Sequence, residues 1–205
     1  CMLPVSYEGD PLMNAVLYGV DTRAEKEIRE LNEELGEEKI LQNCGNALTS
    51  QSVGPKILWL KKNCPEIYKK AYKILSSTSY LVQKLTGESV IDHYTAANFT
   101  PLYDIKNLKW TDALTKNIIE IERLPKLKWT TEIAGYVSKA ASNETGLATG
   151  TPVTVGTIDA AAEAISVGVC SAGDMMMMYG STIFIIQVTN EKIIDGRLWY
   201  APVSY

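Results

Sequence analysis

The sequence has few of the residues that build metal centres, disulfide scaffolds or membrane spans. Its 205 residues include four cysteines and one histidine, His93, and the cysteines form no CxxC pair or recognisable zinc pattern. Such widely spaced thiols indicate a reducing compartment. No apolar run approaches the ~20 residues that cross a bilayer, and residues 1–10 lack the basic and apolar regions of a secretory signal. We therefore expect a cytoplasmic protein with no membrane partner and no metal site of its own.

The sequence also lacks a large excess of charge of either sign. The formal net charge is -4, and lysines alternate with glutamates over residues 23–39, so no basic stripe exists to follow a phosphate backbone. Nucleic acid is therefore not expected as a partner. The hydrophobic content of 46% is enough for a sizeable core. The chain begins at Cys1 and stops just after an apparent strand, which indicates a segment of a longer protein.

Apolar periodicity and its Gly and Pro boundaries predict an α/β protein. A short apolar run predicts a buried strand over residues 12–18. Apolar spacing typical of helices predicts helices over residues 24–35, 55–62, 65–75, 79–85 and 110–123. The first of these helices closes on Gly36, a natural C-terminal cap, and the last is amphipathic and ends at Pro125.

The last third of the chain has a different texture. A strand is expected over residues 153–155, followed by Asp159 and by a helix of small residues over 160–169. Two β-prone runs, 173–179 and 182–188, are separated by a turn. The methionines at 175–178 are interpreted as core filling.

Asp159 is the strongest candidate for chemistry. A carboxylate between the carboxyl end of a strand and the amino end of a helix is held rigidly and faces the crevice where α/β sheets bind ligands. Such an Asp can accept a proton from a hydroxyl. The alternative is that Asp159 only caps the helix, and taken alone this alternative is the better one.

Two further groups could bind ligands. The turn at Gly180, Ser181 and Thr182 offers a close backbone approach, N–H groups and two hydroxyls, which suit a phosphate; the alternative is a plain hairpin turn. Asp21 and Arg23 could exchange hydrogen bonds with sugar hydroxyls, although in isolation a cap and a surface Arg explain them better. Asp92 and His93 are interpreted as structural or peripheral.

The order and spacing of these pieces resemble the FGGY family of carbohydrate kinases, which includes xylulose, ribulose and glycerol kinases. Any one matching stretch is loose, but six in the family's order are specific. The stretches are PLMNAVLYGVDTRA, GPKILWLKKNCPEIY, SYLVQKLTG, DHYTAANFTPLYDI, GLATGTPVTVGTIDAAAEAISVGV and MYGSTIF.

The resemblance implies the actin-like ATPase (ribonuclease H-like) fold, in which two domains close over the sugar and ATP with Mg2+. Residues 1–170 would be most of the sugar-binding domain, and residues 171–205 would begin the ATP-binding domain with its first β-hairpin. Asp159 then matches the family's general base, and Gly180 to Thr182 match its phosphate-binding turn. The family's opening phosphate loop and adenine-binding half are absent, so this chain alone should not catalyse.

The resemblance also implies contacts to the substrate. Phe184 and Gln51 match substrate-contacting positions, Tyr18 matches a substrate-side tryptophan, and Asp21 with Arg23 match the family's Asp-x-Arg pair. One extra residue separates Tyr18 from that pair, compared with xylulose kinases. Ala160 stands where glycerol kinases have Gln, and Ile158 precedes the base as in some ribulose kinases, so glycerol is disfavoured.

We therefore expect ATP-dependent phosphorylation of a sugar or polyol hydroxyl, with a ketopentose such as xylulose or ribulose favoured. The partners are then the sugar and ATP, with a homodimer as a further possibility. One alternative is a catalytically silent sugar-binding or regulatory relative, against which the retention of Asp159 and Gly180-Ser181 argues. A second alternative is a generic scaffold with coincidental motifs, which predicts that Asp159 is buried in a capping hydrogen bond.

Overall fold

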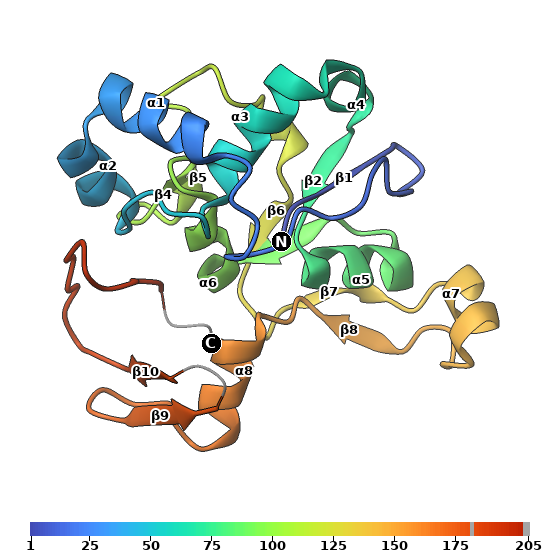
Figure 1. Ribbon diagram of the computed structural model, residues 1–205. Helices are drawn as coiled ribbons and strands as arrows, with labels where there is room; N and C mark the ends of the chain where they lie inside the picture. Colours follow the sequence, from blue (N-terminus) through green and yellow to red (C-terminus); the bar gives the residue numbers. More distant parts are fainter. Residues whose placement is uncertain (181–182, 203–205) are drawn as a thin grey trace.

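The computed structural model describes residues 1–180 and 183–202. Helices make up most of its regular structure: α1 (Glu25–Leu35), α2 (Glu37–Cys44), α3 (Val53–Asn63), α4 (Pro65–Lys70), α5 (Ser77–Thr86), α6 (His93–Ala96), α7 (Lys139–Thr145), α8 (Asp159–Ser166), and the 3-10 turns η1 (Ala97–Phe99) and η2 (Ile121–Arg123). In Figure 1, α1 to α4 cover the upper part of the molecule and α8 lies below them.

The strands are short and pair two by two. They are β1 (Leu3–Val5), β2 (Lys73–Leu75), β3 (Val90–Asp92), β4 (Tyr103–Asp104), β5 (Lys109–Trp110), β6 (Lys126–Lys128), β7 (Ile133–Tyr136), β8 (Pro152–Thr154), β9 (Met175–Tyr179) and β10 (Ile183–Gln187). The β3–β6 pair is parallel, whereas β1–β2, β4–β5, β7–β8 and β9–β10 are antiparallel.

The main core lies between the helices of the first half of the chain and the strands beneath them. Leu31 of α1, Ile40 of α2 and Ile57 of α3 are buried together with Phe99 and Tyr103. Burying a side chain of this size contributes about 1.5–3 kcal/mol, so this cluster fixes the helices against one another. A smaller cluster of Val82, Val90, Ala134 and Val155 joins α5 to β3, β7 and the segment that leads to α8.

Several predicted helices are confirmed. The expectation over 24–35 corresponds to α1, whose C-cap is Gly36 as predicted. The expectations over 55–62, 79–85 and 160–169 correspond to α3, α5 and α8. The strand expected over 153–155 is β8, shifted by one residue.

Three predicted elements are wrong. In the described structure, residues 12–18 form no strand, and one isolated antiparallel bridge joins Val16 to Met2, the residue before β1. The helix expected over 65–75 stops at Lys70, because residues 73–75 form β2 and pair with β1. The helix expected over 110–123 is mostly irregular and keeps only the short turn η2.

The physical reason for the third error is that tertiary contacts satisfy the same apolar residues without a helix. Ile118 and Ile119 are buried in the main core, and the Ile118 carbonyl accepts a hydrogen bond from the Tyr68 hydroxyl at 3.1 Å. At the start of the segment, Trp110 pairs with Tyr103 and donates its ring N–H to the Pro125 carbonyl at 2.7 Å. In the segment 110–123, apolar side chains spaced three or four residues apart are therefore buried without a helical backbone.

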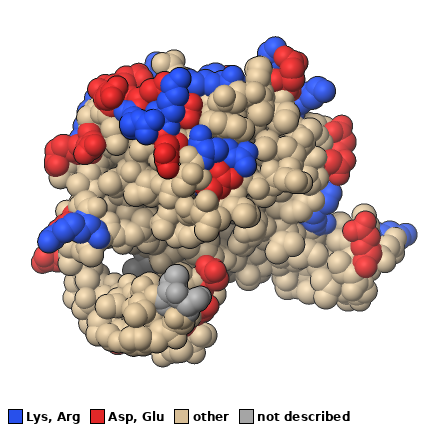
Figure 2. Space-filling view, in the orientation of Figure 1, with Lys and Arg blue, Asp and Glu red and all other residues tan. Residues whose placement is uncertain are grey.

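In Figure 1 the hairpin of β9 and β10 lies below α1 to α4 and beside α8. The two strands pair with each other through five residue pairs, from Ile183 with Tyr179 to Gln187 with Met175. Its side chains alternate between exposed and half-buried, so Met175 and Met177 are exposed and their interpretation as core filling is wrong. Figure 2 shows many charged side chains over α1 and α2 and few on the visible face of the hairpin. The domain boundary at residues 170–171 remains a proposal.

Candidate active site

Asp159 opens α8 with an exposed carboxylate. The N-cap position belongs to Ile158, which offers no side-chain cap, and Asp159 is the first helical residue. Its Oδ1 accepts a hydrogen bond from the Ala160 backbone N–H at 2.8 Å. Asp159 is therefore not the N-cap residue, and its exposure differs from the generic-scaffold alternative, which predicted a buried Asp159 in a capping hydrogen bond.

Two tyrosines lie close to the Asp159 carboxylate. Partial burial raises the pKa of Tyr18, and the negative charge of Asp159 raises it further. Burial also raises the pKa of Tyr94 to about 12, with smaller contributions from the charges of Asp92, Tyr18 and Asp159. Both phenols therefore stay protonated at neutral pH and can donate hydrogen bonds. The charge of Asp159 thus acts on Tyr18, one of the residues proposed from the sequence as a substrate contact.

Tyr94 was not recognised from the sequence as part of this site. It lies on α6, and its ring meets that of Trp199 edge to face at 5.0 Å between centroids. The only available signal was its place in the DHYTAAN stretch, two residues after a buried Asp. Tyr94 thus connects the surroundings of Asp159 to the C-terminal segment of the chain.

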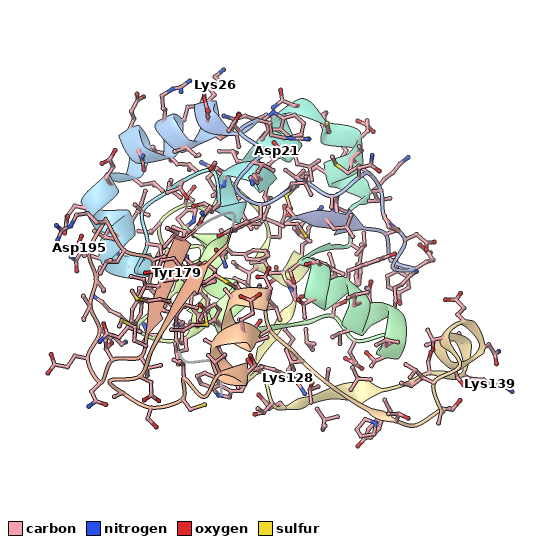
Figure 3. All side chains as sticks on the ribbon, turned by 60° about the horizontal axis from the view of Figure 1, so that its bottom comes forward. Asp21, Lys26, Lys128, Lys139, Tyr179 and Asp195 are labelled. Carbon is pink, nitrogen blue, oxygen red and sulfur yellow. The ribbon has the colours of Figure 1, made fainter. Side chains whose placement is uncertain are left out.

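Asp21 and Arg23 are held mainly by each other. Arg23 Nε donates to both carboxylate oxygens of Asp21, at 2.8 and 3.0 Å, and Arg23 Nη2 lies 2.7 Å from Oδ2. The hydrogen bond from Arg23 is the main reason why the pKa of Asp21 is lowered. The Arg23 guanidinium also stacks over the ring of Trp59 at 4.7 Å. The pair is therefore a preorganised surface of donors and acceptors in the loop before α1 (Figure 3).

Lys56 lies beneath this loop and was also missed. Only 2% of its surface is exposed, and its Nζ donates to the Leu17 carbonyl at 2.6 Å. Burial lowers the pKa of Lys56, while the Asp21 carboxylate raises it. A buried lysine is costly unless paired, so this contact fixes the backbone just before Tyr18.

Gln51 lies beside the same loop and lines a pocket of about 230 Å³. Polar side chains from two segments of the chain line the pocket together with the segment Gly196 to Trp199; the polar side chains are those of Asn46, Thr49, Ser50, Gln51, Ser52, Asn98 and Thr100. A β-carbon at Gly19 would stand 3.9 Å from Gln51 Cγ, which shows how near Gln51 is to the Tyr18 loop. Asp159, Asp21 and Arg23 do not line this pocket.

The remaining candidates belong to the C-terminal hairpin. Phe184 is half-buried on β10, opposite Met178. Gly180 follows β9, whose last residue, Tyr179, is labelled in Figure 3. Ser181 and Thr182 lie outside the described residues, so the structure does not test the phosphate-binding turn.

The described residues contain no group of three His, Cys, Asp or Glu side chains arranged to hold a metal ion. Mg2+ in a kinase commonly keeps several waters and uses one or two carboxylates together with the phosphates of its nucleotide. Such a role needs no cluster of three ligands from the protein. Across the described part of the chain, none of the helices combines the length and the apolar character that a membrane span requires.

The class of protein follows from comparison of this chain with known families. The model of the FGGY family of carbohydrate kinases, N-terminal domain, matches residues 3–166, and the chain belongs to this family.

Particular relatives are kinases of small molecules. The chain is 33% identical over 175 residues to the autoinducer-2 kinase of Klebsiella pneumoniae, covering 83% of this chain and 32% of that protein. It is 25% identical over 202 residues to the xylulose kinase of Staphylococcus xylosus, covering 97% and 41%. The chain thus spans well under half the length of these relatives.

Solved structures agree. The xylulose kinase of Rhodospirillum rubrum superposes with a TM-score of 0.91 at 28% identity, covering 97% of this chain and 40% of that one. The glycerol kinase of Plasmodium falciparum, solved with ADP, gives a TM-score of 0.80 at 26% identity, covering 90% and 37%. The predicted family and the partial actin-like ATPase fold of sugar kinases are confirmed, and the coincidental-scaffold alternative is wrong.

Proposed function

We propose that the complete protein carrying this chain transfers the γ-phosphoryl group of ATP to a hydroxyl of a sugar or polyol. The observation that supports this most directly is the exposed Asp159 carboxylate at the start of α8, with Tyr18 and Tyr94 close to it. In the proposed reaction Asp159 accepts the proton of the attacking hydroxyl as its oxygen bonds to phosphorus. ATP with Mg2+ would supply the phosphoryl group, and the bond from the γ-phosphorus to the bridging oxygen would break to release ADP.

The other residues of this chain would position the sugar. The Asp21–Arg23 pair offers acceptors and donors to sugar hydroxyls, and Gln51 offers an amide from the pocket beside it. Tyr18 and Phe184 are proposed as the aromatic contacts, and the turn from Gly180 as the phosphate contact. Phosphoryl transfer needs mainly positioning and charge stabilisation from the protein. These residues offer the types of group that positioning the sugar and the phosphate requires.

A ketopentose is the favoured substrate. Ala160 and Ile158 disfavour glycerol, and the superposed xylulose kinase of R. rubrum covers nearly the whole chain. A second candidate is the substrate of the autoinducer-2 kinases, since a relative of that name is 33% identical over most of the chain. A silent sugar-binding relative is the alternative without catalysis.

The test is the variant Asp159→Asn in the complete protein, assayed with xylulose, ribulose, glycerol and autoinducer-2. We expect turnover on the accepted substrate to fall by about 100-fold to 10,000-fold while sugar affinity changes little, because Asn keeps the shape but accepts no proton. Glu163→Gln is the matched control, since it removes a carboxylate one turn further along α8. A turnover above about a tenth of the wild-type value in Asp159→Asn would rule out the assigned base.

A further inference from the structure

The loop that leads into Asp159 is tied to two distant parts of the chain by side-chain hydrogen bonds. Thr157 Oγ1 donates to Asp92 Oδ2 at 2.9 Å. The carbonyl of Thr157 accepts from Thr78 Oγ1, on α5, at 3.2 Å. Thr157 is thus held through both its side chain and its backbone, two residues before Asp159.

Asp92 is the shared anchor of two site elements. It is only 2% exposed, and the oxygen that accepts from Thr157 also accepts the Thr95 backbone N–H at 3.1 Å, which makes Asp92 the N-cap of α6. α6 carries Tyr94. One buried carboxylate therefore connects the loop before Asp159 to the helix that carries Tyr94. The two residues that make this contact, Asp92 and Thr157, are 65 residues apart in the sequence.

The packing around this anchor leaves the loop little freedom. Gly156 has a φ of +72°, which a side chain would make unfavourable. A β-carbon there would also stand 3.2 Å from Thr78 Cγ2, so the loop lies directly on α5. Hydrogen bonds to an ionised acceptor are roughly twice as strong as neutral ones, and burial at Asp92 shields them from competition with water.

We propose that Asp92 and Thr157, supported by Thr78, are positioning residues that hold the general base Asp159 and Tyr94 in fixed relation. This inference rests on the proposed function. None of the three residues needs to touch the sugar or ATP. Their effect arises because a displacement of about 1 Å in a reacting group can cost about 100-fold in rate.

The test compares Thr157→Val with Thr157→Ser in the complete protein. Val keeps the branched shape and removes the hydroxyl, whereas Ser keeps the hydroxyl and removes a methyl group. We expect Thr157→Val to lower kcat by about 10-fold to 100-fold with a nearly unchanged KM for sugar, because only the reacting geometry is lost. Thr157→Ser should keep kcat within about 3-fold of wild type, since the hydrogen bond survives.

Ser138→Ala is the control for a merely structural effect. Ser138 caps α7 as Asp92 caps α6, with its Oγ accepting from Ala141 N at 3.1 Å. Its loss should lower thermal stability by an amount typical of a cap without changing kcat. Thermal unfolding of every variant shows which are folded, and Thr78→Val provides a second way to loosen the loop if Thr157→Val does not fold.

The outcomes separate this inference from the proposed function. If Asp159→Asn is inactive while Thr157→Val and Thr78→Val both turn over like wild type, the positioning role is wrong and the base assignment stands. Equal losses in Thr157→Val and Thr157→Ser would also overturn the positioning role. If Asp159→Asn stays active, the proposed base fails, whatever the Thr157 variants do.

Discussion

Gly54 gives a sharp test of the packing beneath the candidate site. It is the second residue of α3, where the helix crosses the backbone of Thr100 and Pro101. A β-carbon at Gly54 would overlap the Thr100 carbonyl oxygen and would stand 2.7 Å from Pro101 Cδ and 3.0 Å from the Thr100 carbonyl carbon. Most of these are backbone atoms, which cannot rotate away as a flexible side chain can.

Two opposing effects set the expected size for Gly54→Ala. Alanine favours a helix over glycine by about 1 kcal/mol. Overpacking a tight contact costs about 1–3 kcal/mol, and rigid backbone on the far side favours the upper end. We therefore expect a net loss of about 2 kcal/mol, which lowers the Tm of a domain of this size by about 4–8 °C.

Thermal unfolding followed by circular dichroism is the assay, and Gly196→Ala is the matched control. A β-carbon at Gly196 would meet no atom closer than Leu41 Cδ2 at 3.8 Å. That substitution should leave Tm unchanged or raise it slightly. A Gly54→Ala protein as stable as wild type, or more stable, would show that helix propensity governs the site and that the close approach of α3 to Thr100 is wrong.

Two further predictions concern charged and titrating groups. Burial lowers the pKa of His93 in the folded protein, and the charges of Asp92 and Glu132 raise it by smaller amounts. As the pH falls, His93 is therefore protonated in the unfolded chain at a higher pH than in the folded one. Stability should therefore fall as the pH drops below about 6.5, and urea midpoints at pH 7.5 and 5.5 should differ more in wild type than in His93→Gln. Arg23→Met removes the partner of Asp21 and should raise the KM for sugar by about 10-fold or more with a smaller effect on kcat. Arg29→Met, exposed on α1, is the control in the same kinetic assay, and equal KM values would contradict a sugar-binding role for Arg23.

Local signals in the sequence were enough to predict those helices that begin or end at a distinctive residue. Gly36 closes α1 as expected, and the strand–Asp–helix reading places Asp159 at the start of α8. The pairing of β1 with β2 had no such signal. Each strand has three residues, and Leu3 pairs with Leu75 across most of the first half of the chain. Strands this short are defined by their partners, which a local pattern does not contain.

The candidate site divides in the same way. Asp159, Asp21 and Arg23 could be proposed because each is a charged residue next to an apparent strand or helix. Tyr94 and Lys56 could not, because their roles depend on which residues the fold brings to them. Lys56 carries a charge, which by itself favours a solvent-facing position, yet it is 2% exposed. Its acceptor, the Leu17 carbonyl, is a backbone group and carries no sequence signal.

The candidate site consists mostly of loops, and this raises the question of what holds its geometry. The loop before α1 is held by Lys56, the loop before α8 by Asp92, and the C-terminal segment by Asn46, whose side chain exchanges hydrogen bonds of 2.8 and 2.7 Å with the backbone of Tyr200. Each anchor is a polar side chain at most 3% exposed, and they reach 39, 65 and 154 residues along the chain.

A buried polar group that loses its partner keeps the full cost of leaving water, about 1–3 kcal/mol and more for a charge. Each loop is therefore confined to the position that satisfies its anchor, because a small displacement leaves a buried charge or amide unpaired. Irregular backbone can in this way place Tyr18 and Asp159 as firmly as a regular sheet would. The same reasoning explains why Asp92, which has no need to touch a substrate, is expected to influence turnover through the position of Asp159.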